Sequence, residues 1–218
     1  MKLKKGVIVV NFKTYQESTS KNAIKLAKQC ESVSKNVVVC VDALSLKEVS
    51  KEVKIPVFGQ HVDGVSYGGH TGTLNPDMLK KAGAKGSLIN HSENRYSKKQ
   101  LVAAINSCKT QGFFSLVCVQ TSLEAKYVAT LNPDAIAIEP PELIGGDISV
   151  TTANPKIITK TIKAVSSVNP NISVLCGAGV KTKEDVRIAL NLGATGVLLA
   201  SGITKSKNAK RSLQELII

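Results

Sequence analysis

The sequence predicts an α/β protein, a compact (β/α)8 barrel of eight parallel strands with some shortened helices. Eight short apolar runs rich in β-branched residues recur along the chain. They are apolar on both faces, as strands are in a parallel sheet covered by helices. Most are followed by a segment with helical periodicity. Eight such units within 218 residues, without a long linker, favour a closed barrel and a single domain over residues 1–218.

The apolar runs themselves give the predicted strands. These are residues 6–10, 36–41, 55–58, 86–89, 113–119, 135–138, 172–176 and 195–200. Apolar residues at helical spacing predict amphipathic helices around 23–27, 101–105, 157–165 and 186–192. The helix of the second unit, 44–53, is expected to be short, and the last, near 209–217, to be minimal. The predicted barrel is therefore a compact one.

Composition limits the core and the partners. Hydrophobic residues make up 43% of the chain but aromatic residues only 4%, so Val, Ile, Leu and Ala must build the core. The net charge of +13 would attract a phosphorylated metabolite, a nucleic acid or an acidic membrane surface. The lysines are spread along the chain, however, and no aromatic-interleaved basic motif appears. We therefore favour solvated helix faces over a nucleic-acid role.

The cysteines and the N-terminal residues indicate a compartment. Five cysteines show no C-x-x-C spacing, and three of them lie in apolar runs, which is typical of core residues in a reducing compartment. The apolar run at 7–10 is too short for a signal sequence, and no run reaches membrane-spanning length. We expect a cytoplasmic protein without a membrane partner.

Polar residues that close the apolar runs are candidate site residues, because barrel active sites lie at the C-terminal ends of the strands. Three of these residues are ionisable and suited to chemistry: Lys13, His91 and Glu139. The full set of polar and small residues at these ends is Asn11, Lys13, Gln60, Asn90, His91, Gln120, Glu139, Gly177, Ala200 and Ser201.

Glu139 closes the sixth run and is followed by two prolines and, further on, by Gly145 and Gly146. Prolines end the strand, and the glycines give the loop a pliable finish. A carboxylate at the end of a strand, with a hinged loop behind it, is a plausible catalytic base under a lid. The structural alternative is a cap or an ion-pair partner.

His91 and Lys13 follow their strands in ways that suit catalysis. We expect a helix to begin directly after His91, with Ser92 as N-cap and Glu93 in the first turn. The positive end of the helix dipole would then keep the imidazole neutral, as a donor to a carbonyl oxygen. Lys13 lies two residues from Asn11 on the same side and supplies a fixed cation. The alternatives are a structural histidine and one more surface lysine.

Two glycine-bearing turns close the last two strands, at 176–180 and 196–202. Small residues there let backbone N–H groups approach an anion, and this is the usual phosphate position in such barrels. The spacing fits neither a Rossmann nor a P-loop fingerprint. The remaining histidines, His61 and His70, lie in a glycine-rich region, and we interpret them as structural or interfacial.

Taken in order, the motifs resemble the triosephosphate isomerase family, and more closely its short archaeal form, over essentially the whole chain. The matching segments are Asn-Phe-Lys at 11–13, Gly-Gln-His-Val-Asp at 59–63, Gly-Gly-His-Thr-Gly at 68–72, Asn-His-Ser-Glu-Asn-Arg at 90–95, Glu-Pro-Pro-Glu-Leu-Ile-Gly at 139–145 and Cys-Gly-Ala-Gly at 176–179. The fold that this resemblance implies is a TIM barrel.

The resemblance also implies an activity, the interconversion of dihydroxyacetone phosphate and D-glyceraldehyde 3-phosphate in glycolysis and gluconeogenesis. Glu139 would move a proton between neighbouring carbons through an enediolate, with neutral His91 as the electrophile. Lys13 and Asn11 would hold the substrate, supported by Glu93. No metal or organic cofactor is implied. The phosphate would be bound under a lid of residues 140–147 by Ile144, Gly145, Gly179, Ala200 and Ser201.

The resemblance has one departure and leaves alternatives. The lid of the family usually ends in a Gly-Thr-Gly-like hinge, whereas residues 145–147 read Gly-Gly-Asp, which bears on lid closure. The loop 64–73 resembles the family's interface loop, so a homo-oligomer, dimer or tetramer, is expected. One alternative is another phosphate-binding barrel isomerase or aldolase. The other is a non-catalytic module that binds phosphate or nucleic acid.

Overall fold

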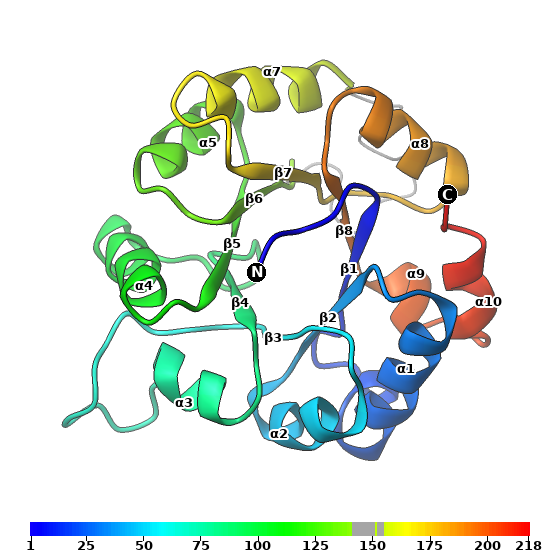
Figure 1. Ribbon diagram of the computed structural model, residues 1–218, viewed down its shortest axis with the longest axis horizontal. Helices are drawn as coiled ribbons and strands as arrows, with labels where there is room; N and C mark the ends of the chain where they lie inside the picture. The colour runs from blue at the N-terminus through cyan, green and yellow to red at the C-terminus, as the bar shows by residue number, and fades with distance from the viewer. Residues whose placement is uncertain (141–150, 152–154) are drawn as a thin grey trace.

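The computed structural model, which describes residues 1–140, 151 and 155–218, confirms the predicted barrel (Figure 1). All eight strands run parallel, and each pairs with the next along the chain until β8 closes on β1. The strands are β1 Val7–Asn11, β2 Val37–Val41, β3 Val57–Gly59, β4 Gly86–Ile89, β5 Phe114–Val119, β6 Ala135–Ile138, β7 Ser173–Cys176 and β8 Gly196–Leu199. Their C-terminal ends therefore all meet at one mouth.

Helices surround the barrel. Their bounds are α1 Ser20–Val33, α2 Ala43–Glu52, α3 Pro76–Lys81, α4 Lys98–Thr110, α5 Ser122–Thr130, α7 Pro155–Ser166, α8 Lys183–Asn191, α9 Ser201–Thr204 and α10 Ala209–Gln214, with a 3-10 turn η1 at Gln16–Ser18. The shortness of α3, α9 and α10 agrees with the compact barrel that the sequence predicts. Within the residues that the structure describes, no helix combines the length and apolarity needed to cross a bilayer.

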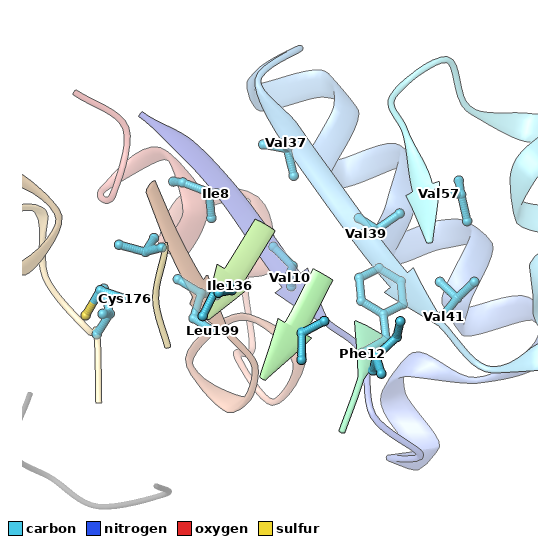
Figure 2. Packing of buried hydrophobic residues seen from close by; sticks show 14 of the residues in the cluster. Ile8, Val10, Phe12, Val37, Val39, Val41, Val57, Ile136, Cys176 and Leu199 are labelled. Atoms are coloured by element: carbon cyan, nitrogen blue, oxygen red, sulfur yellow. The ribbon is translucent and has the colours of Figure 1, made fainter. Parts of the chain in front are cut away.

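Alternation along the strands creates two apolar layers. In β1, Val7 and Val9 belong to the cluster inside the barrel, whereas Ile8 and Val10 belong to the larger cluster between sheet and helices. Figure 2 shows part of that outer layer. Each fully buried aliphatic side chain contributes roughly 1.5–3 kcal/mol to folding. All five cysteines are free and buried, as expected of core residues.

One predicted helix start is wrong. The chain after His91 forms a turn, and α4 begins only at Lys98. The reason is local: Ser97 and Gln100 form a capping box, in which the Ser97 hydroxyl accepts from the Gln100 N–H and the Gln100 side chain accepts from the Ser97 N–H. Ser92 is therefore not an N-cap, and the expected dipole at His91 does not exist.

Candidate active site

A single cleft at the C-terminal mouth of the barrel brings the candidate residues together. Asn11 is the last residue of β1, Lys13 lies two residues further on, His91 follows β4, and Glu139 follows β6 directly. The loops after β7 and β8 line the opposite side of this cleft with Gly177, Ala178, Gly179, Ala200 and Ser201. The predicted catalytic and phosphate-binding residues that the structure describes therefore share one pocket.

Glu139 is buried, with only 4% of its surface exposed. Its Oε1 lies 3.7 Å from His91 Nε2, and its Oε2 has no hydrogen-bond partner among the described residues. Burial raises the pKa of Glu139 from 4.5 to about 7, against the opposing effects of a hydrogen bond from the Cys118 thiol and the charge of Lys13. Such a carboxylate is a base matched to neutral pH.

Glycine 177 makes room for this base. A Cβ at Gly177 would lie 2.6 Å from Glu139 Cγ and 3.2 Å from the Ile138 carbonyl oxygen. Real Cβ atoms essentially never lie within 3.0 Å of another heavy atom, so the contact of 2.6 Å means that the Glu139 side chain adopts this position only beside a glycine. The glycine in the turn after β7 thus leaves the space that the side chain of Glu139, directly after β6, occupies.

His91 is held as a neutral imidazole, although not by the helix dipole that the sequence suggested. The backbone N–H of Glu93 donates to His91 Nδ1 at 3.2 Å, so Nδ1 is an acceptor and Nε2 carries the proton. Burial lowers the pKa of His91, and the Lys13 charge lowers it further, while Glu93 opposes the shift. The Nε2–H therefore points into the cleft, where it can donate to a substrate oxygen.

Lys13 is fixed at the mouth by its backbone and by its ammonium group. Its φ of 51° lies in the left-handed region, which costs a non-glycine residue roughly 1–3 kcal/mol. The Lys13 N–H donates to Asn11 Oδ1 at 3.0 Å, and Gln60 Nε2 donates to the Lys13 carbonyl at 2.8 Å. The ammonium Nζ lies 2.6 Å from Glu93 Oε1. These contacts hold a cation beside His91 and Glu139.

The cleft is also lined by two residues that the sequence analysis missed, Tyr15 and Lys181. Lys205 Nζ lies over the Tyr15 ring, 4.3 Å from its centroid. Tyr15 follows Lys13 by two residues and Lys181 follows Gly179 by two, so a search of the residues just after each motif would have found them. Gly179 has a φ of 67°, a conformation that glycine adopts freely.

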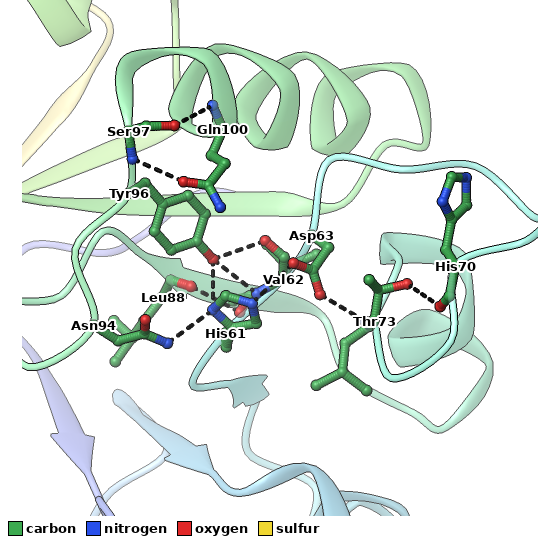
Figure 3. Close-up of polar contacts among 12 residues, drawn as sticks. His61, Val62, Asp63, His70, Thr73, Leu88, Asn94, Tyr96, Ser97 and Gln100 are labelled. Atoms are coloured by element: carbon green, nitrogen blue, oxygen red, sulfur yellow. Dashed lines mark hydrogen bonds and ion pairs between the residues drawn. The ribbon is translucent and has the colours of Figure 1, made fainter.

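Two further sets of predicted residues have different outcomes. Ile144 and Gly145, with the Gly-Gly-Asp segment at 145–147, lie outside the described residues. His61 lies beside the site and contacts Asp63, Asn94 and Tyr96 (Figure 3), while His70 is exposed on the loop 64–73. Over residues 1–140, 151 and 155–218, no group of three His, Cys, Asp or Glu side chains is arranged to hold a metal ion.

Comparison with known proteins gives triosephosphate isomerases, both as a family and as individual relatives. A family model described as triosephosphate isomerase matches residues 6–216. The triosephosphate isomerase of Methanothermus fervidus is 46% identical over 215 residues, covering 97% of each chain. That of Archaeoglobus fulgidus is 45% identical over 98% of each chain.

A solved structure gives a similar result for the fold. Triosephosphate isomerase from Bartonella henselae has a TM-score of 0.75 and covers 96% of this chain and 98% of its own. The two sequences are 21% identical, so this likeness supports the fold alone.

Proposed function

This chain belongs to the triosephosphate isomerase family, and on that premise we propose how Glu139, His91 and Lys13 divide the reaction between them. The family identity, at about 45% over nearly the full length, makes the protein an enzyme that interconverts dihydroxyacetone phosphate and D-glyceraldehyde 3-phosphate. Triosephosphate isomerase is itself a familiar example of a glutamate base beside a neutral histidine under a closing loop.

Glu139 is the base. It takes the proton from the hydroxyl-bearing carbon next to the carbonyl, leaving an enediolate, and returns that proton to the former carbonyl carbon. The hydroxyl proton passes to the former carbonyl oxygen, so that the hydroxyl and carbonyl groups exchange places. The observation that carries this assignment is a buried carboxylate whose Oε2 has no partner among the described residues and whose pKa burial raises to about 7. A base with this pKa is half ionised near neutral pH and gives the proton back as readily as it takes it.

His91 is the electrophile, and Lys13 balances charge. The Nε2–H of His91 donates to the carbonyl oxygen, whose negative charge grows as the enediolate forms. Support comes from the acceptor role of Nδ1 and from the distance of 3.7 Å between Nε2 and Glu139 Oε1, which leaves both groups access to one small substrate. Lys13 adds a fixed positive charge, Asn11 holds the Lys13 backbone, and Glu93 holds the ammonium group.

The phosphate of the substrate binds at the other side of the cleft. Gly179, Ala200 and Ser201 line the same pocket as Lys13, and their small size lets backbone N–H groups approach an anion. The expected contribution of Ile144 and Gly145, under a lid of residues 140–147, belongs to the same proposal and rests on the family resemblance.

The role of Glu139 is tested by shortening its side chain. Glu139→Asp retracts the carboxylate by about 1 Å, which should lower kcat roughly 100-fold or more in a coupled assay with glyceraldehyde 3-phosphate. Glu139→Ala should be slower still. As a control, Glu215→Asp makes the same change at the exposed C-cap of α10 and should leave kcat unchanged. Turnover by Glu139→Asp near that of the native enzyme would refute the assignment.

We also propose that each chain acts as one barrel domain in a cytoplasmic homo-oligomer, at least a dimer. The loop 64–73 extends from the barrel beside α3 (Figure 1), and Tyr67 on it is exposed. Asp63 closes the base of the loop, with its N–H donating to the Leu74 carbonyl at 2.7 Å and its Oδ2 accepting from the Leu74 N–H at 2.8 Å. Light scattering should give a molar mass of at least twice the 23.1 kDa of one chain, and the mass of a single chain would contradict the proposal.

A further inference from the structure

The position of His91 contradicts the alternation of the strand that precedes it. In β4, Leu88 belongs to the cluster inside the barrel and Ile89 to the cluster between sheet and helices. Side chains alternate along a strand, so a continued strand would direct Asn90 inward and His91 outward, toward the helices. His91 nevertheless lines the cleft at the mouth, with Nε2 3.7 Å from Glu139 Oε1. Some feature after Ile89 must reverse the alternation.

The backbone of Asn90 is that feature. Its φ of 62° lies in the left-handed region, which few residues other than glycine adopt, although asparagine tolerates it better than most. Asn90 is 1% exposed, so no solvent contact accounts for this conformation. A left-handed residue turns the chain out of the extended direction, and the next side chain then points over the barrel mouth instead of outward.

The side chain of Asn90 holds this turn against β5. The strand pairing ends with Ile89 opposite Val117, and Asn90 Nδ2 then donates to the carbonyl of Cys118 at 2.9 Å. Asn90 Oδ1 accepts from the Tyr96 N–H at 3.0 Å, which closes the turn on itself. The amide thus uses both of its ends, one on the neighbouring strand and one on the far side of the turn.

Two further contacts anchor the same turn. Arg95 Nη1 donates to the Asn90 carbonyl at 3.3 Å, while its Nη2 pairs with Glu124 at the start of α5. The Tyr96 hydroxyl donates to the Val62 carbonyl at 2.8 Å, so the far end of the turn is tied to the chain after β3 (Figure 3). The turn that carries His91 is therefore fixed to neighbours on both sides of β4.

We propose that Asn90 is a positioning residue for the isomerase reaction. Its left-handed backbone, held by the side-chain amide, aims the His91 Nε2–H at the substrate oxygen. This inference rests on the proposed role of His91. Asn90 is not among the residues that line the cleft, and its effect on turnover passes through His91 alone.

A double-mutant cycle tests whether Asn90 acts through His91. His91→Gln should lower kcat about 100-fold or more, the usual loss of a catalytic proton donor. Asn90→Ala should lower kcat roughly 10- to 100-fold while KM stays within about threefold, since a 1 Å displacement has effects of this size. The double variant should be no slower than His91→Gln within about threefold, because a residue that acts through His91 has no effect once His91 is gone.

A second variant separates the backbone conformation from the lost amide. Asn90→Gly lacks the amide, as Asn90→Ala does, but adopts positive φ freely. It should therefore be at least about fivefold faster than Asn90→Ala. The matched control is Asn132→Ala, because Asn132 has a φ of 60° but lies outside the cleft. This control carries the same backbone strain and should keep kcat and KM within about twofold.

The outcomes distinguish this inference from the proposed function. Losses that multiply in the double variant, an Asn90→Ala enzyme with native kcat, or an Asn90→Gly enzyme no faster than Asn90→Ala would each overturn the positioning role. Native kcat in His91→Gln would instead overturn the proposed role of His91 itself. If Asn90→Ala does not fold, the cycle is measured with Asn90→Gly and the same non-additivity is required.

Discussion

The two sides of the cleft are built by different means. On the side of β1, β4 and β6, the groups that we propose for catalysis are side chains, and Lys13, His91 and Glu139 are held by hydrogen bonds, burial and two left-handed residues. On the side of β7 and β8, the pocket is lined by backbone and small residues such as Gly177 and Gly179. The first side depends on which side chains are present, and the second on which are absent.

The two sides of the cleft also differ in how much they destabilise the folded protein. A buried carboxylate and left-handed backbone at Lys13 are unfavourable for folding and persist because the surrounding packing holds them. The glycines after β7 are unfavourable for folding mainly because glycine loses more backbone entropy than other residues. The side with the proposed catalytic side chains therefore stores most of the unfavourable free energy of the site, and replacing the buried carboxylate there should lower activity and raise stability.

The largest expected effect comes from adding a side chain where the phosphate side must be bare. Gly177→Ala places a methyl group 2.6 Å from Glu139 Cγ and should displace the base, lowering kcat/KM about 100-fold. For comparison, Gly202→Ala on the same side of the cleft adds a methyl group that meets no protein atom within 4 Å, and it should leave Glu139 in place and lower kcat/KM less. Steady-state kinetics that found both variants equally active would contradict the close packing of Gly177 on Glu139.

The next effect is the pH dependence of turnover. Burial raises the pKa of Glu139 to about 7, and the base must be ionised to take a proton. The value of kcat/KM for the free enzyme should therefore fall as pH drops below about 7, approaching tenfold per pH unit. His91 does not produce this loss in the same range, because burial lowers its pKa below the ordinary value of 6.5. A flat profile between pH 5 and 8 would contradict the assignment.

The smallest effect concerns stability. The Glu139 carboxyl binds its proton more tightly in the folded protein, with a pKa of about 7, than at its ordinary value of 4.5. Between these pH values the folded state binds more protons than the unfolded state, so the free energy of unfolding falls as pH rises. Glu139→Gln has no carboxyl group to ionise, so its free energy of unfolding does not fall in this way. At pH 8 it should be more stable than the native protein, by a few kcal/mol at most.

Urea unfolding at pH 4.5 and pH 8 measures this difference, at one protein concentration because an oligomer responds to concentration. The higher free energy of unfolding of Glu139→Gln, relative to the native protein, should be present at pH 8 and absent at pH 4.5. Equal gains at both pH values would show that the ionised carboxylate is not the source. Together with the pH profile of kcat/KM, this measurement separates the effect of the buried carboxylate on stability from its effect on activity.

Much of this protein was determined by local sequence patterns. The β-branched runs predicted all eight strands. A strand that is apolar on both faces must be buried on both, and a parallel barrel buries one face against the helices and the other in its interior. The ends of those runs also identified Lys13, His91 and Glu139, since barrel topology brings all strand ends to one mouth. The motif order then indicated the family, which the comparisons confirm.

Only the tertiary structure decided how these residues are tuned. The sequence suggested a helix dipole at His91, but burial and the Glu93 N–H set its neutral state, and the Asn90 turn gives its direction. Gly177 and Glu139 pack closely although they lie 38 positions apart in the sequence. Periodicity reports which face of a strand is apolar. Burial, pKa and close approach depend on neighbours distant in the chain, and these become defined only when the barrel closes.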